Sequence, residues 1–212
     1  MNAELEAELI RRLTDSIPRE LVVAVDENFR AAAKHAYKIT ADRHEGHRAS
    51  ALGQERHFSL NEALANALGG CDIAHTEIKG TGLVVGTVGS ISISRFTTNH
   101  PKWTNKDKSA RRLELVQANR WLEDLIQPSL LDFEGESSER LAIFFVTVFA
   151  GQAEEPSSIN LVVPDVRLRS ELFCQSLFEF RQHYSAPAPQ VDAVKVHLKK
   201  SAAGKKTSDG QT

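Results

Sequence analysis

The stretch LVVGTVGSISISRFT, residues 83–97, decides the fold class, because here the chain changes from helical to strand periodicity. LVVGTV (83–88) and ISISRFT (91–97) have the β-branched composition of strands, and Gly89-Ser90 between them is typical of a two-residue hairpin turn. The second strand alternates apolar and polar side chains, in the order Ile91, Ser92, Ile93, Ser94. We therefore expect an antiparallel hairpin with one polar face.

The chain before this hairpin is predicted to be helical. Residues 3–14 and 16–39 each carry apolar side chains at helical spacing. A further helix is expected from Phe58 to Gly69-Gly70, with Ser59-Leu60-Asn61-Glu62 as a capping box at its start.

The segment before Phe58 is less regular. Gly46 and Gly53 each weaken a helix by roughly 1 kcal/mol relative to alanine. We therefore expect residues 44–57 to form a broken helix or a structured loop.

The remaining elements complete an α+β pattern. They are a strand at 75–79, a helix at 106–127 stopped by Pro128, a central strand at 141–150, a buried strand at 159–163 and a helix from Pro164-Asp165 to Tyr184. The order ααα-βββ-α-ββ-α predicts a mainly antiparallel sheet of about five strands with helices packed on it. We assign 1–188 to a single α+β domain and 189–212 to a disordered Lys/Gly/Ser-rich tail.

The bulk properties exclude several classes of function. The net charge of −2 gives no global attraction to nucleic acid or acidic lipid, so such contacts require a local basic patch. Cys71 and Cys174 form no metal-binding or disulfide pattern. The first residues lack the apolar core of a signal peptide, and the apolar run at 141–151 is too short to span a bilayer. We therefore expect a cytoplasmic protein without a membrane partner.

Titratable side chains are concentrated in HEGHRASALGQERHF, residues 44–58. One interpretation is a zinc or manganese site built on His44, His47 and His57, since two histidines three apart share a helix face. HEGH is not HExxH, however, and the metallopeptidase geometry is missing. We predict no cofactor and keep a divalent metal as an alternative.

A second interpretation of this segment is an anion or nucleotide pocket. Its candidate donors to phosphate are Arg43, Arg48, Arg56 and His57. Gln54 and Asn61 add amide groups, and a helical path would align them with His57 at i, i+3 and i+7. The competing interpretation is a solvated surface segment with ordinary ion pairs.

Asp72, Glu77 and Lys79 form the pattern D-x4-E-x-K. A magnesium nuclease of the PD-(D/E)xK type places an acid and an ExK on adjacent strands. Here the ExK lies on the first predicted strand, and the later hairpin carries no acids. We favour surface residues of an edge strand.

The most basic part of the predicted domain is 100–121. Its candidate binding residues are Lys102, Trp103, Arg111, Arg112 and Arg120. One aromatic among several cations is a footprint for nucleic acid or an acidic protein. The alternative is the polar face of an amphipathic helix.

Two functions follow. The first is a cytosolic interaction or regulatory protein that engages a nucleic acid or a partner protein through 43–57 and 102–120. The alternative is a small enzyme acting on a nucleotide, nucleic-acid or other phosphorylated substrate. Its base would be His47 or His57, with Arg48 and Arg56 clamping the charge. We favour binding because it requires fewer specific geometries, and the sequence leaves both catalysis and oligomeric state open.

Overall fold

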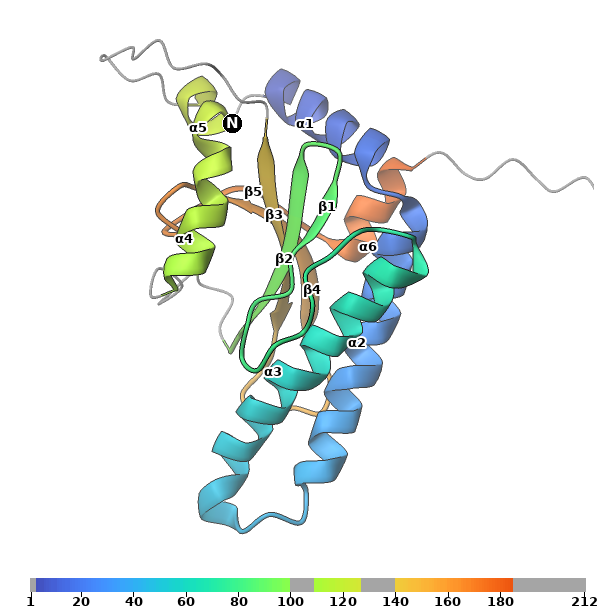
Figure 1. Ribbon diagram of the computed structural model, residues 1–212, viewed down its shortest axis with the longest axis vertical. Coiled ribbons are helices and arrows are strands. Elements are labelled where there is room, and N and C mark those ends of the chain that lie inside the picture. Colours follow the sequence, from blue (N-terminus) through green and yellow to red (C-terminus); the bar gives the residue numbers. More distant parts are fainter. Residues whose placement is uncertain (1–2, 100–108, 127–139, 185–212) are drawn as a thin grey trace, which may run out of the picture.

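The computed structural model describes residues 3–99, 109–126 and 140–184. Over these residues the chain is an α+β fold, with helices first and then a five-stranded sheet (Figure 1). The predicted fold class is confirmed. No helix in these ranges is both long and apolar enough to cross a membrane.

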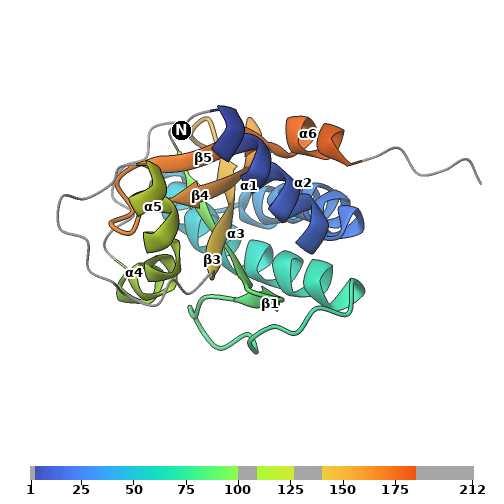
Figure 2. The same cartoon turned by 90° about the horizontal axis from the view of Figure 1, so that it is seen from above.

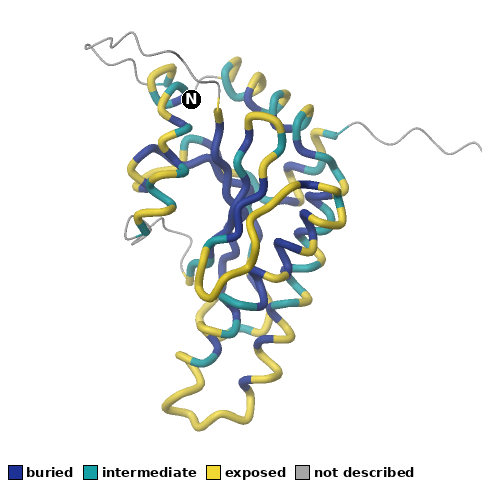
Figure 3. Tube along the Cα trace, viewed as in Figure 1, coloured by how far each residue is buried: buried dark blue, intermediate teal, exposed yellow. Residues whose placement is uncertain are grey.

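The first helices are α1 (Ala3–Ser16), α2 (Arg19–Thr40) and α3 (Glu45–Gly70). Helices α2 and α3 form an antiparallel hairpin that projects beyond the end of the sheet (Figure 1). The side chains from residue 41 to residue 50 at its tip are exposed (Figure 3). The tip of the α2–α3 hairpin is therefore accessible to solvent, whereas the rest of the hairpin packs against the sheet.

The expected break before Phe58 is wrong, because α3 is one continuous helix capped by His44, whose Nδ1 accepts the Gly46 N–H at 3.2 Å. The expected capping box at 59–62 is also wrong. Ser59 lies inside the helix, and its hydroxyl donates to the Glu55 carboxylate at 3.2 Å. Leucines such as Leu52, Leu60 and Leu64 are buried along α3. Each buried leucine contributes about 2 kcal/mol, which outweighs the glycine cost.

The strands are β1 (Gly86–Val88), β2 (Ile91–Thr98), β3 (Leu141–Val148), β4 (Ser158–Pro164) and β5 (Glu171–Ser176). They lie in sequential order in one sheet, where β2 and β3 are parallel and the other neighbours are antiparallel. The predicted hairpin turn is confirmed, with Gly89 at φ +55°. The predicted central strand is β3.

A parallel pair needs a long crossover. Between β2 and β3 the described part of it comprises α4 (Ala110–Val116), the 3-10 turn η1 (Gln117–Asn119) and α5 (Arg120–Ile126). The buried Asn119 amide fixes this crossover to the sheet. Its Oδ1 accepts from the Ala142 N–H at 2.6 Å, and its Nδ2 donates to the Ala142 and Pro164 carbonyls at 3.0 and 2.8 Å.

Helices cover both faces of the sheet. Helices α1 to α3 pack on one face, where Phe145 and Ile93 join the larger apolar core. Helix α4 packs on the other face, where Phe96, Phe144 and Val116 form a smaller core. Figure 2 shows the sheet between these two sets of helices.

Two local predictions are wrong. Residues 75–79 form no strand, and only an isolated bridge joins His75 to Gly86. The expected helix at 165–184 is instead β5 followed by α6 (Leu177–Phe180) and the 3-10 turn η2 (Arg181–His183). The Asp165 carboxylate accepts from the Arg169 N–H and the Ser170 hydroxyl, which closes a turn. The chain therefore reverses and pairs with β4.

Candidate anion-binding site

The site is centred on Arg95 in β2. Side chains alternate between the two faces of a strand, so Arg95 lies on the same face as Ile91 and Ile93, against α3. Its side chain is almost completely buried, with 2% exposed. A cation therefore occupies a position where the strand pattern calls for an apolar residue.

Neutral atoms hold the Arg95 guanidinium. Its Nε and Nη2 donate to the Asn61 Oδ1 at 2.9 and 2.7 Å. Nη2 also donates to the His57 carbonyl and lies 3.3 Å from the Nδ1 of the same histidine. Nη1 donates to the Thr97 hydroxyl at 3.3 Å. These bonds attach α3 firmly to β2, but they supply no negative charge.

The charge of Arg95 is uncompensated within the part of the chain that the structure describes, where no carboxylate forms an ion pair with it. Burial, together with the positive charge of Arg112, lowers the pKa of Arg95 to about 9. The group still carries its proton at neutral pH. A buried ion held only by neutral groups is costly to a fold.

Arg112 in α4 is a second cation, stacked on Phe96, whose side chain lies on the opposite face of β2 from Arg95. Ser109 caps this helix by accepting the Arg112 N–H. The guanidinium lies over the Phe96 ring, 5.4 Å from its centroid, and Phe96 is the residue that follows Arg95 in β2. Its Nε is buried without a hydrogen-bond partner among the described residues. Burial lowers the pKa of Arg112 too.

His57 supports Arg95. Burial first, and then the charge of Arg95, lowers the pKa of His57, so its ring is neutral at neutral pH. With Nδ1 beside the Arg95 donor, the proton belongs on Nε2, which lies 3.3 Å from the Thr81 carbonyl. Asn61 donates to the neighbouring Gly82 carbonyl at 3.0 Å. Both ring nitrogens are therefore occupied, which favours a supporting role over that of a general base.

A polar stripe on α3 leads to this site. Its members follow the heptad spacing of one helix face and are His47, Ser50, Gln54, His57 and Asn61. The first three are exposed, His57 is half-buried and Asn61 is buried, so exposure falls steadily toward Arg95 (Figure 3). At 1.5 Å per residue the stripe is about 21 Å long. The predicted alignment of Gln54, His57 and Asn61 thus exists within a longer pattern.

The structure separates the predicted metal ligands. His44 and His47 lie together at the tip, with ring centroids 6.0 Å apart. His57 is ten residues further along α3, or about 15 Å from His47. The described ranges contain no group of three or more His, Cys, Asp or Glu side chains able to hold a metal ion. Arg43 and Arg48 are exposed at the same tip (Figure 3).

Arg56 faces a different part of the fold from the site. It is buried with its guanidinium 3.8 Å from the centroid of the Phe149 ring. It donates to the Gly151 carbonyl at 3.2 Å and to the Ala153 carbonyl, which fixes the turn after β3. Its bonds indicate a structural role.

The other predicted cations lie on the surface or outside the described residues. Arg111 pairs with Glu114 at 2.7 Å, and Arg120 donates to the Gln117 side chain at 3.2 Å. Lys102 and Trp103 lie outside the described residues, as does the tail at 189–212.

The nuclease pattern does not assemble on strands. Glu77 and Lys79 form an exposed ion pair at 3.0 Å in the loop before β1. Asp72 lies in the turn that follows α3, with φ +56°. An acid and an ExK on adjacent strands are therefore not found here.

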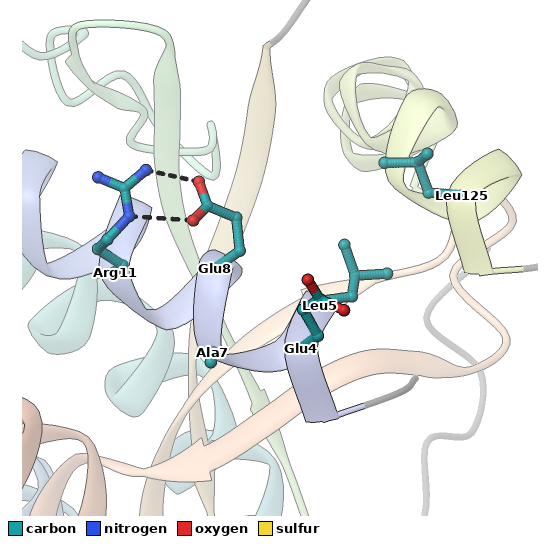
Figure 4. Close-up of a pocket in the computed structure, with 6 residues that line it drawn as sticks. All are labelled: Glu4, Leu5, Ala7, Glu8, Arg11 and Leu125. Carbon is teal, nitrogen blue, oxygen red and sulfur yellow. Dashed lines mark hydrogen bonds and ion pairs between the residues drawn. The ribbon is translucent and has the colours of Figure 1, made fainter.

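An open groove of about 610 Å³ lies elsewhere, between α1 and α5 (Figure 4). Leu5 and Leu125 face each other across it, and the Arg11 guanidinium binds the Glu8 carboxylate at its rim. The one arginine that lines this groove, Arg11, is already paired with Glu8, in contrast to Arg95.

Sequence reasoning missed Arg95 and Thr97. The signal was present in ISISRFT, where the arginine continues the face of Ile91 and Ile93. Its partner Asn61 was selected, but as a ligand-binding amide.

Comparison with protein-family models, curated proteins and solved structures found no match to this chain.

Proposed function

We propose that this chain is a cytosolic nucleic-acid-binding protein that holds phosphate at the Arg95–Arg112 site. The observation that carries the proposal is the Arg95 guanidinium, which is buried in β2 with only neutral partners among the described residues. A second guanidinium, that of Arg112, lies half-buried over Phe96 on the other face of the strand. Cys71 and Cys174 are not joined in a disulfide, which accords with a reducing compartment.

Phosphate is the ligand that best fits this chemistry. A guanidinium presents planar donors that match the oxygens of phosphate. Among the described residues the Arg112 Nε has no hydrogen-bond partner, and the half-buried side chain of Arg112 is stacked on Phe96. A bound anion would satisfy these donors and cancel the repulsion between Arg112 and Arg95, in surroundings where low polarity strengthens the interaction.

The polar stripe supports a polymer as the ligand. Arg43 and Arg48 lie at the tip, where α3 begins, and Arg95 contacts the middle of the helix at His57 and Asn61. A duplex carries one negative charge per roughly 1.7 Å of axis, so several phosphates can face a stripe of about 21 Å. Each of the two segments predicted to bind supplies a residue to the proposed phosphate-binding surface. His57 belongs to 43–57 and Arg112 belongs to 102–120.

The enzyme alternative has less support. A small enzyme with His57 as its base would need a free ring nitrogen, and both nitrogens already face protein atoms. His47 is exposed at the tip, about 15 Å from the arginine site along α3.

The test measures binding of fluorescently labelled DNA and RNA oligonucleotides by anisotropy. We compare the wild type with Arg112→Gln and, as a matched control, with Arg11→Gln, which removes an exposed arginine of α1. Removing one hydrogen bond to a charged group should weaken binding by about tenfold or more in Arg112→Gln and leave the control unchanged. Equal weakening in both variants, or binding of an acidic peptide in place of any oligonucleotide, would refute the proposal.

A further inference from the structure

The groove between α1 and α5 presents apolar side chains that the described residues leave open to solvent. It has a volume of about 610 Å³, and Leu5 and Leu125 face each other across it (Figure 4). Leu125 is 59% exposed. A groove of this volume with an apolar lining is large enough to hold a bound group of several side chains.

The rim of the groove is acidic. Glu4 and Glu8 both lie on its α1 side, and Arg11 pairs with Glu8 at 2.6 Å. No arginine, lysine or histidine of the described residues forms an ion pair with Glu4. Charge complementarity therefore favours an occupant that joins apolar side chains to positive charge.

The C-terminal tail contains one segment of this character, VDAVKVHLKK at 191–200. Composition predicts disorder for the tail as a whole, but this segment contains no glycine, serine or proline. Three apolar positions follow the i, i+3, i+7 spacing of one helix face, and they are Val191, Val194 and Leu198. This spacing is typical of an amphipathic helix that binds in a groove, and Lys195 and Lys199 adjoin the apolar face.

The tail begins within reach of the groove. The Tyr184 hydroxyl donates to the Ile17 carbonyl at 2.8 Å, which holds the last described residue beside the end of α1. Arg11 is six residues back from Ile17, or about 9 Å along the helix, and Leu5 is about 18 Å back. Residues 185–190 span up to roughly 20 Å when extended. A segment tethered at this range meets the groove at a high effective concentration.

Charge distinguishes the tail from the segment that follows α5. Residues 127–139 contain four acids and no lysine or arginine, so they share the sign of the groove's rim. Residues 185–212 contain five lysines and two aspartates, which gives them the opposite sign. Electrostatics therefore favours the tail as the occupant.

We propose that residues 191–198 dock as a short helix in the groove between α1 and α5 of the same chain. The apolar face of this helix packs between Leu5 and Leu125, and the adjoining lysines lie beside Glu4. Packing in the groove supplies the stability that so short a helix lacks by itself. This surface is separate from the one proposed to hold phosphate, so the inference goes beyond the proposed function and fails or stands independently of it.

The experiment records NOE cross-peaks between methyl groups in the full-length chain by NMR. We expect cross-peaks between the Leu125 methyl groups and those of Leu198. Val194→Asp places a charge on the docking face and should remove these cross-peaks. Val196→Asp is the matched control and should keep them, because position 196 lies on the opposite side of the helix.

A second pair of variants tests the charge of the rim. Glu4→Lys should weaken the cross-peaks between Leu125 and Leu198, because it replaces attraction to the tail lysines by repulsion. Glu27→Lys makes the same change at an exposed position of α2 and should leave the cross-peaks unchanged. All four variants change exposed or tail residues, and circular dichroism establishes that each one folds.

The opposing outcomes are distinct. Absence of the cross-peaks in the wild type would overturn the proposal, and their loss in Val196→Asp as well as in Val194→Asp would overturn the helical docking. Cross-peaks that appear only between differently labelled molecules in a mixed sample would assign the groove to the tail of a second copy. Cross-peaks from Leu125 to residues 127–139 in place of Leu198 would assign it to that segment. Each of these two assignments would overturn docking by the chain's own tail.

Discussion

Replacing Asn61 by leucine tests whether Arg95 is a buried charge that depends on neutral hydrogen-bond partners. Leucine has the same branched arrangement of side-chain heavy atoms as asparagine and makes no hydrogen bonds. Asn61→Leu removes the acceptor that Arg95 contacts at 2.9 and 2.7 Å, and also the donor to Gly82 at 3.0 Å. The guanidinium then stays buried with fewer partners.

The magnitude follows from these bonds. A hydrogen bond to a charged group contributes about 1.5–3 kcal/mol and a neutral one about 1 kcal/mol, while taking a partner from a buried charge costs roughly 3–5 kcal/mol. The new leucine returns about 1–2 kcal/mol by burial. We expect Asn61→Leu to lower the free energy of unfolding by about 2–4 kcal/mol. Adding Arg95→Met removes the charge, so the double variant should lie within about 1 kcal/mol of the wild type.

The assay is urea unfolding followed by circular dichroism, with the free energies combined in a double-mutant cycle. A coupling of about 2–3 kcal/mol between the two positions is expected. The reasoning is refuted if the double variant is less stable than Asn61→Leu alone, because the charge of Arg95 would then stabilise the fold. A stable double variant that no longer binds an oligonucleotide would mean that the charge serves binding.

Three further predictions concern stability and salt. Asn119→Ala removes the bonds to Ala142 and Pro164 and should lower the free energy of unfolding by about 2–4 kcal/mol in the same urea assay; a loss under about 0.5 kcal/mol would contradict the role of this amide. The folded pKa of His57 lies below its ordinary value, so the unfolded chain takes up a proton first and stability falls as pH drops below about 6.5. Melting temperatures at pH 7.5 and 5.5 should differ less in His57→Gln than in the wild type, and an equal difference would contradict the assignment. For oligonucleotide binding, the slope of log K against log salt concentration should fall by about 1 in Arg112→Gln, and an unchanged slope would place Arg112 outside the phosphate contacts.

The elements that could be predicted from the sequence are those specified locally. The hairpin at 83–97 follows from residue alternation and Gly89-Ser90, and β3 follows from an apolar run that only a central strand can bury. Strand β5 escaped prediction because pairing with β4 imposes its extended form, after a turn closed by Asp165. Helix α3 continues through Gly46 and Gly53 because packing against α2 outweighs local propensity.

For the candidate site, the sequence predicted several of the residues but not the contacts between them. His57, Asn61 and Arg112 were selected as binding residues from composition and spacing. The contacts of His57 and Asn61 with Arg95 required tertiary structure, because α3 and β2 are far apart in the chain. Arg56 was selected for the same compositional reason, yet it packs on Phe149 and supports a turn. Residue type alone does not distinguish an arginine that bonds the carbonyls of a turn from one that joins a helix to a strand.

The most direct test of the central claim is to observe the arginine side chains during ligand binding. The Nε–H signals of Arg95 and Arg112 can be followed by NMR while a 5′-phosphorylated oligonucleotide is added, with Arg56 as an internal reference for a buried, structural guanidinium. The account predicts that the signals of Arg95 and Arg112 shift together in proportion to the bound fraction, while that of Arg56 does not move. Binding that leaves the Arg95 and Arg112 signals unchanged would contradict it.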